Sequence, residues 1–298
     1  IACARSAADN ARIVIGQINP RVPQTMGNSG VHVSRFAVLT EVDRPLYAHE
    51  PGPIGEIERA IGTHIAALIP DRATLQMGIG AIPDAVLSCL QDRQDLGVHT
   101  EMFSDGLLDL VDSGVITNRF KTTWRGRIVA SFAVGSQRLY DAVDLNPFVE
   151  FHGADVVNDT REIRRIEKMV AINSAIEIDL TGQIVADSIG TKIYSGIGGQ
   201  MDFVHGAKLA PDGKAVIALP STARGGQQSR IVPSIAPGAG VVTSRGHVQY
   251  VATEYGIVNL EAQPLARRAE LLISIAHPDF RAELTDAAKA RHFSIPDA

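Results

Sequence analysis

One glutamate, Glu101, stands where an acid could do chemistry. The segment 97–106 reads Gly-Val-His-Thr-Glu-Met-Phe-Ser-Asp-Gly, which predicts a strand over Gly97–Met102 followed by a turn. In a parallel α/β sheet this glutamate would lie at the carboxyl edge, where open sheets bind ligands. A carboxylate there can serve as a nucleophile, a base or a metal ligand. A lone glutamate is more often a surface acid or a helix-capping partner, and spacing alone favours that interpretation.

A first glycine-rich loop, Gly78-Ile79-Gly80-Ala81-Ile82, joins a predicted strand (73–77) to a predicted helix whose first turn holds Pro83. Glycines let a ligand approach the backbone, and free N–H groups at a helix start bind anions or a developing oxyanion. Because Pro83 replaces the third glycine, this is not the dinucleotide-binding fingerprint. A tight turn that binds nothing explains the pattern equally well, and both interpretations stay open.

A second glycine loop, Gly196-Ile197-Gly198-Gly199, could supply a second set of backbone donors, although a sharp turn is the favoured interpretation. The same holds for Asn158, for which turn chemistry is favoured over a substrate contact. Asp105 is expected to cap the helix that follows it. His99 lies two residues before Glu101 and therefore on the same face of the strand, and we favour a buried core histidine.

The elements that must position these residues alternate between strand and helix from residue 73 to residue 151, which predicts a parallel α/β sheet. Residues 169–180 alternate in hydrophobicity and turn at Thr181-Gly182 into 183–187, which predicts an antiparallel hairpin. Residues 11–18 (ARIVIGQI) are typical of a buried strand. Three prolines between Pro45 and Pro53 predict an inter-domain linker.

Composition narrows the function classes. The 298 residues are 45% hydrophobic with a net charge of −5, which argues against a non-specific nucleic-acid binder. No apolar run approaches a membrane span. The two cysteines, Cys3 and Cys89, lack metal-ligand spacing and are expected to be small apolar residues in a reducing compartment. We therefore expect a cytoplasmic protein that holds no metal. The chain starts with Ile1 in what reads as a helix, so we also expect a fragment or a processed chain.

Several motifs together resemble the acetyl-CoA hydrolase/transferase family, especially its 4-hydroxybutyrate or butyrate-type CoA-transferase branch. The resemblance covers essentially the whole chain. Its main stretches are 75–86 (LQMGIGAIPDAV), 99–106 (HTEMFSDG), 178–185 (IDLTGQIV), 195–200 (SGIGGQ) and 253–256 (TEYG).

The resemblance implies an open, mostly parallel sheet of the CoA-transferase (NagB/RpiA-like) type with an added antiparallel hairpin. It implies that residues 1–53 are the end of a first α/β domain plus a linker, and that 54–298 are the second domain. Family members are usually longer at the N-terminus, so a missing N-terminal domain is expected, as is a homo-oligomer, in the simplest case a homodimer.

The resemblance also implies the chemistry. Glu101 would be the nucleophile, attacking an acyl-CoA and passing through a glutamyl-CoA thioester to a short carboxylic acid. Coenzyme A would enter as a substrate, in acetate or butyrate metabolism. Contacts to it would come from Gly78, Ile79, Gly80, Ala81, Ile82, Asn158, Gly198 and Gly199. Two alternatives stay open, an acetyl-CoA hydrolase that uses the same glutamate and a non-catalytic CoA-binding fragment.

Overall fold

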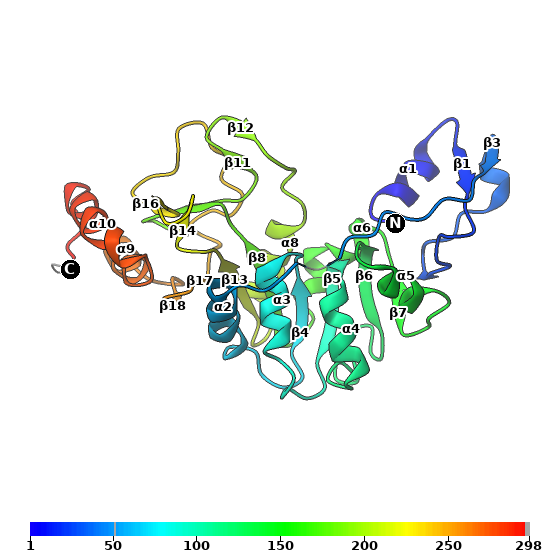
Figure 1. The fold of residues 1–298 in the computed structure, drawn as a ribbon, viewed down its shortest axis with the longest axis horizontal. Helices are drawn as coiled ribbons and strands as arrows, with labels where there is room; N and C mark the ends of the chain where they lie inside the picture. The colour runs from blue at the N-terminus through cyan, green and yellow to red at the C-terminus, as the bar shows by residue number, and fades with distance from the viewer. Residues whose placement is uncertain (51, 296–298) are drawn as a thin grey trace.

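A nine-stranded sheet forms the centre of the protein in the computed structural model, which describes residues 1–50 and 52–295 (Figure 1). The strand order is β18-β17-β13-β8-β4-β5-β6-β7-β2, and every pairing is parallel except that of β17 with β18. The predicted α/β class is therefore confirmed. The strands are β2 (Met26–Gly27), β4 (Thr74–Met77), β5 (Gly97–Phe103), β6 (Ile128–Ala133), β7 (Val149–Phe151), β8 (Met169–Ser174), β13 (Lys214–Ala218), β17 (Tyr250–Thr253) and β18 (Gly256–Asn259).

The strand order reverses between β4 and β8. From β4 the chain moves outward through β5, β6 and β7, and then returns to place β8 on the other side of β4. From there it continues through β13 and β17. Ligands of open α/β sheets bind at the carboxyl ends of the strands beside such a reversal. Glu101 lies on β5, one strand away from it.

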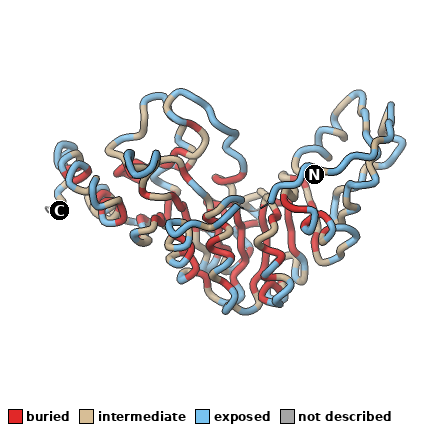
Figure 2. The backbone as a smooth tube through the Cα atoms, in the orientation of Figure 1, coloured by how far each residue is buried: buried red, intermediate tan, exposed pale blue. Residues whose placement is uncertain are grey.

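Helices cover both faces of the sheet because its strands are apolar on both sides. Along β8, Val170 and Ile172 belong to one buried cluster, and Met169 and Ala171 belong to another. Figure 2 shows these strands as the buried centre of the molecule. Helices α2 (Glu56–Ala66), α3 (Ala81–Ser88), α4 (Asp105–Asp112) and α5 (Gln137–Val143) contribute to the first cluster, and α6 (Ala154–Val157), α7 (Thr160–Ile163) and α8 (Gln200–Leu209) to the second.

The predicted hairpin is confirmed in a shorter form. It consists of β9 (Glu177–Asp179) and β10 (Ile184–Val185), which pair antiparallel. The residues before Ala175 do not belong to it. They form β8, a parallel strand of the central sheet, because their apolar side chains are buried on both faces rather than one.

Further short strands extend the hairpin into an arm above the sheet. Its other strands are β11 (Ser188–Ile189), β12 (Lys192–Ile193), β14 (Thr222–Ala223), β15 (Gln228–Ser229) and β16 (Ile231–Val232). In Figure 1 this arm rises on one side of the molecule, and the N-terminal segment rises in the same direction at the other end. The second glycine loop connects the arm to α8.

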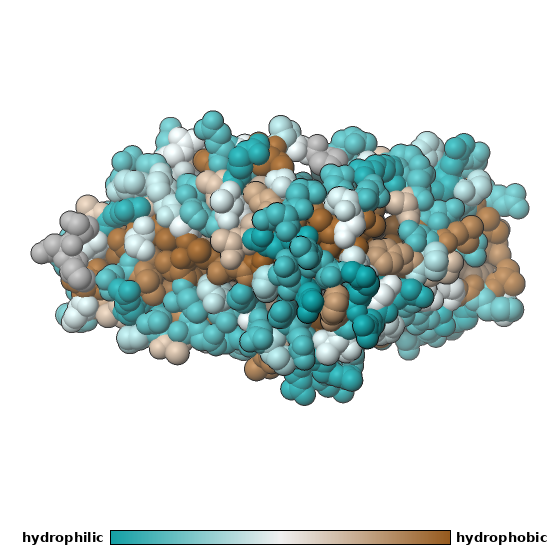
Figure 3. Space-filling view, turned by 90° about the horizontal axis from the view of Figure 1, so that it is seen from below, coloured by the Kyte–Doolittle hydropathy of each residue, from teal (hydrophilic) through white to brown (hydrophobic). Residues whose placement is uncertain are grey.

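The N-terminal segment corrects one prediction. Its elements are α1 (Ala4–Asn10), β1 (Ile15–Ile18), the 3₁₀ turn Val33–Arg35 and β3 (Val38–Glu41). Within the described residues β1 pairs only with β3, so its side chains stay uncovered and Ile15 is 69% exposed rather than buried. Figure 3 shows hydrophobic residues at this end of the molecule. Cys3 is also exposed, contrary to expectation, whereas Cys89 is partly buried.

The chain ends in two helices, α9 (Leu265–Ser274) and α10 (Pro278–Ala290). Ala269 and Leu272 of α9 and Leu284 of α10 pack into the second buried cluster. Across the described ranges, none of the helices combines the length and apolar character that crossing a bilayer requires.

Candidate active site

The Glu101 carboxylate accepts a hydrogen bond from the backbone of the second glycine loop. Its Oε2 lies 2.9 Å from the amide nitrogen of Gly199. Gly199 is the N-cap of α8, where N–H groups have no partner within the helix and the helix dipole is positive. The carboxylate therefore lies, half-buried, at a positive helix end.

Gly199 allows this approach because it has no side chain. A Cβ at this position would lie 2.3 Å from Nδ2 of Asn158 and 2.4 Å from Oε2 of Glu101. Both separations are far below van der Waals contact. Gly198 before it has φ +56°, in the left-handed region that favours glycine. The structure thus brings Glu101, Gly198, Gly199 and Asn158 together from three separate parts of the chain.

Asn158 lies at the end of α6, where a buried histidine contacts the residue before it. Asn158 is the C-cap of α6, and Nε2 of His99 lies 2.8 Å from the carbonyl oxygen of the preceding Val157. His99 is fully buried, and desolvation lowers its pKa to about 3. It is therefore neutral at physiological pH and donates its Nε2 proton to Val157. His99 behaves as the predicted core histidine, and its contact with α6 places it on the same side of the sheet as Glu101.

The first glycine loop lies at the same sheet edge, one strand away. Backbone pairing between β4 and β5 reaches only Leu75 and Val98. Beyond that point Oγ1 of Thr100 donates to the carbonyl of Met77 at 3.0 Å. Gly80 then adopts φ +107° as the N-cap of α3. Within residues 1–50 and 52–295, no hydrogen bond joins Gly78, Ile79, Gly80, Ala81 or Ile82 to Glu101.

A pair of side-chain amides ties the two strands at the reversal point. Nδ2 of Asn173 on β8 donates to Oε1 of Gln76 on β4 at 2.9 Å. Gln76 is only 4% exposed. Gln76 is not among the residues predicted for the site, although an uncharged polar residue inside an apolar strand is a signal that can identify such a position.

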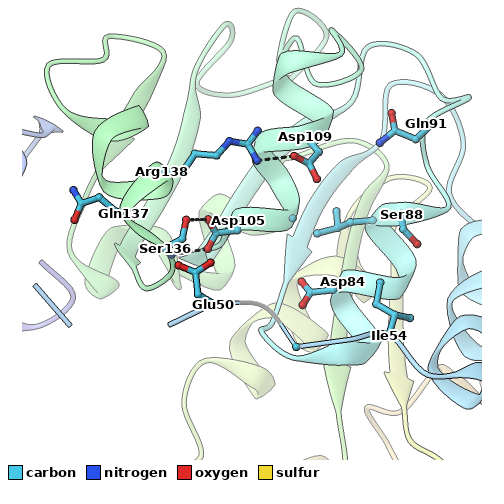
Figure 4. Close-up of a pocket in the computed structure, with 13 residues that line it drawn as sticks. Glu50, Ile54, Asp84, Ser88, Gln91, Asp105, Asp109, Ser136, Gln137 and Arg138 are labelled. Atoms are coloured by element: carbon cyan, nitrogen blue, oxygen red, sulfur yellow. Dashed lines mark hydrogen bonds and ion pairs between the residues drawn. The ribbon is translucent and has the colours of Figure 1, made fainter. Parts of the chain in front are cut away.

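A cavity of about 440 Å³ lies on the opposite face of the sheet, between α3, α4, α5 and the segment around Glu50 (Figure 4). Its lining is acidic. Burial and the nearby Asp105 raise the pKa of Asp84 there, an effect partly offset by His49. Because carboxylates repel phosphate groups, this cavity is poorly suited to the phosphates of coenzyme A.

Asp105 in this cavity corrects a prediction. The N-cap of α4 is Ser104, and the Asp105 carboxylate instead accepts from the amide of Ser136 at 2.8 Å and from its hydroxyl at 2.5 Å. Ser136 is the N-cap of α5. Asp105 therefore joins the starts of two neighbouring helices rather than capping its own (Figure 4).

In the portion of the chain that the structure covers, no three histidine, cysteine, aspartate or glutamate side chains form a cluster that could hold a metal ion. The groups around Glu101 are suited to a different task. They consist of a carboxylate, a backbone N–H at a helix start and a side-chain amide. The backbone N–H and the side-chain amide are hydrogen-bond donors, and such donors stabilise negative charge as it develops on an oxygen during acyl transfer.

Comparison with known proteins shows which family the chain belongs to. The model of the acetyl-CoA hydrolase/transferase C-terminal domain matches residues 135–288. The 4-hydroxybutyrate coenzyme A transferase of Clostridium kluyveri is 48% identical over 96% of this chain and 67% of its own length. The chain belongs to the acetyl-CoA hydrolase/transferase family. The family resemblance seen in the motifs is thereby confirmed.

Other proteins are similar over nearly the whole chain. The succinyl-CoA:acetate/propanoyl-CoA:succinate CoA transferase of Fasciola hepatica is 49% identical over 98% of this chain and 62% of its own length. The crystal structure of RipA from Yersinia pestis superimposes with a TM-score of 0.94 at 40% identity, covering 98% of this chain and 66% of that one. The chain thus spans about two thirds of the length of these relatives.

Proposed function

We propose that the protein is a CoA-transferase that moves CoA between a short-chain acyl-CoA and a carboxylic acid. The observation that supports this proposal is the hydrogen bond from Gly199 to Glu101, because a carboxylate and a backbone N–H donor meet there. The relatives with 39–49% identity are named as CoA-transferases acting on 4-hydroxybutyrate, succinate, acetate, cyclohexane-1-carboxylate or butyrate. This range supports a short-chain acyl-CoA, with acetyl-, butyryl- and 4-hydroxybutyryl-CoA as the first substrates to test.

In this proposal the Glu101 carboxylate attacks the thioester carbonyl of the acyl-CoA. The carbon–sulfur bond breaks, CoA leaves as a thiolate, and a mixed anhydride of Glu101 and the acyl group remains. The thiolate then attacks the carbonyl carbon of Glu101, the acyl carboxylate leaves, and a glutamyl-CoA thioester forms. An incoming carboxylate reverses the sequence. Dividing the exchange in this way replaces one difficult step with easier ones.

Each attack places negative charge on a carbonyl oxygen. The amide of Gly199 donates to Glu101, and the side-chain amide of Asn158 lies against the same glycine. Removing one such donor typically costs about 2.7–4 kcal/mol of transition-state stabilisation. We assign the first glycine loop, Gly78 to Ile82, to binding coenzyme A, because it follows the neighbouring strand and presents backbone N–H groups at the start of α3.

The experiment is to incubate the full-length protein with butyryl-CoA, reduce it with borohydride and locate the modified residue by mass spectrometry. Reduction of a glutamyl thioester converts the Glu101 carboxyl carbon to an alcohol and lowers the mass of the peptide that contains it. If no CoA-dependent modification occurs at Glu101, the proposal fails.

Measuring CoA release with and without an acceptor carboxylate distinguishes a transferase from a hydrolase in the same enzyme preparation. A transferase releases free acid only when an acceptor carboxylate takes the CoA, whereas a hydrolase uses water. Three acetyl-CoA hydrolases among the relatives are 26–30% identical to this chain, which favours the transferase. Steady release of CoA without any acceptor would overturn this choice.

We also propose that residues 1–53 end a first α/β domain and lead into the second domain at residue 54. The uncovered strands β1 and β3 support this division, because parallel strands are normally covered on both faces. Strand β2 of the same segment pairs with β7 and adds to the edge of the second domain's sheet. A cytoplasmic location and a homodimer complete the proposal. Size-exclusion chromatography with light scattering of the full-length protein tests the oligomeric state.

A further inference from the structure

Each glycine-rich loop carries one large apolar side chain with a glycine on either side of it. The first loop has Ile79, which is 49% exposed, and the second has Ile197, which is 60% exposed. In the part of the chain that the structure describes, neither side chain belongs to the two buried clusters or packs against them. Packing of the fold therefore does not explain an apolar side chain at either position.

Ile197 lies close to the carboxylate of Glu101. Its loop is attached there, because Gly199 donates to Oε2 of Glu101. A Cβ at Gly198 would lie 3.9 Å from the same oxygen. Allowing for the bond to that Cβ and for the usual spacing of consecutive Cα atoms, the Cα of Ile197 lies within about 9 Å of Oε2. In Figure 1 the segment from β12 to α8 descends from the arm to the sheet. Ile197 thus belongs to a segment that is fixed beside the attacking carboxylate.

An acyl-CoA that is attacked by Glu101 has two groups on its carbonyl carbon besides the oxygen. One is the sulfur of CoA and the other is the acyl chain, and they leave the carbon in different directions. The proposed function assigns CoA to the first glycine loop, on the β4 side of Glu101. The acyl chain then points away from that loop and toward the second one. An isoleucine side chain and the three carbons after the carbonyl of a butyryl group together span most of the distance from the Cα of Ile197 to the carboxylate.

We infer that the side chain of Ile197 forms an apolar wall against which the acyl chain of the substrate packs. Ile197 is then a residue that determines specificity for chain length, whereas Glu101 and Gly199 act on the carbonyl group that all acyl-CoA substrates share. Burying one methylene against an apolar surface strengthens binding by about fourfold. Because butyryl-CoA has two more methylenes than acetyl-CoA, this wall favours the longer substrate. The inference rests on the proposed function.

The chain-length selectivity of the full-length protein tests this role. We expect Ile197→Ala to lower the ratio of kcat/KM for butyryl-CoA to kcat/KM for acetyl-CoA by about three- to tenfold. Ile79→Ala, in the loop assigned to CoA, should lower both values alike and leave the ratio within about twofold, because both substrates carry the same CoA. Ile189→Ala is the matched control, since this isoleucine is 57% exposed on β11 of the same arm and its loss should change neither value.

A ratio within about twofold of the wild-type value in Ile197→Ala would overturn the inference, as would a shift of the ratio in Ile79→Ala instead. The thermal unfolding midpoint shows whether each variant folds. If Ile197→Ala does not fold, Ile197→Val provides the comparison, and its ratio should fall by a smaller factor. A wild-type protein that never forms a CoA adduct at Glu101 would refute the proposed function itself. Adduct formation with unchanged selectivity in the Ile197 variants refutes only this inference.

Discussion

The amide of Gly199 donates a 2.9 Å hydrogen bond to the Glu101 carboxylate, although 98 positions separate the two residues in sequence. The contact joins the end of β5 to the start of α8. It gives the carboxylate a fixed orientation and supplies a donor for charge that develops on the same atoms.

Glu101→Gln should reduce CoA exchange by roughly a thousandfold or more, because an amide cannot serve as the nucleophile. The fold should persist, since a glutamine can still accept from Gly199. The measurement is the rate of acyl-CoA exchange beside the thermal unfolding midpoint. Glu167→Gln, an exposed acid at the end of a loop, is the matched control. Exchange at the wild-type rate in Glu101→Gln would rule out Glu101 as the nucleophile.

Gly199→Ala should reduce kcat at least about tenfold, because its Cβ would collide with Asn158 and Glu101 and displace both. Gly199→Val should lower kcat further. Gly196→Ala in the same loop is the comparison, because a Cβ there meets no atom within 4 Å and a much smaller loss is expected. Equal losses in the two alanine variants would indicate that the loop acts only through its flexibility.

Acid stability should depend on His99. Its pKa is about 3 in the folded protein and 6.5 in an unfolded chain, so the unfolded state binds more protons between these values. Stability therefore rises with pH across this window and falls as the pH drops from 6.5 toward 3, by at most about 1.4 kcal/mol per pH unit for this one group. His99→Gln keeps a donor for Val157 and should have a flatter profile. The check is chemical denaturation of both proteins between pH 5 and 6.5, where parallel profiles would contradict the assignment.

Asp105→Ala should destabilise the fold by about 1–3 kcal/mol, because it leaves the amide and hydroxyl of Ser136 without their acceptor. Asp109→Ala, which breaks an exposed ion pair with Arg138, should cost no more than about 1 kcal/mol. Urea unfolding of the two variants gives the comparison. A larger loss in Asp109→Ala would mean that the link between Asp105 and Ser136 contributes little.

The sequence by itself determined the α/β class, because the alternation of apolar strands and amphipathic helices between residues 73 and 151 depends only on local periodicity. It also placed Glu101 near the end of a strand, and His99 on the same side of it, since side chains alternate along a strand. Local patterns did not separate β8 from the hairpin, because a strand buried on both faces and one strand of a hairpin are both rich in apolar residues.

Only the tertiary structure decided what surrounds Glu101. Gly199 and Asn158 come from segments whose spacing along the chain carries no information about their separation in space. For the second glycine loop and for Asn158, local patterns favoured simple turns, because a glycine turn and a backbone donor loop have the same composition. The contacts made by Gly199 form only when α6 and α8 pack against the same face of the sheet. That packing depends on contacts between residues far apart in the sequence. Glu101 could therefore be singled out from its strand, whereas its partners became visible only in the folded chain.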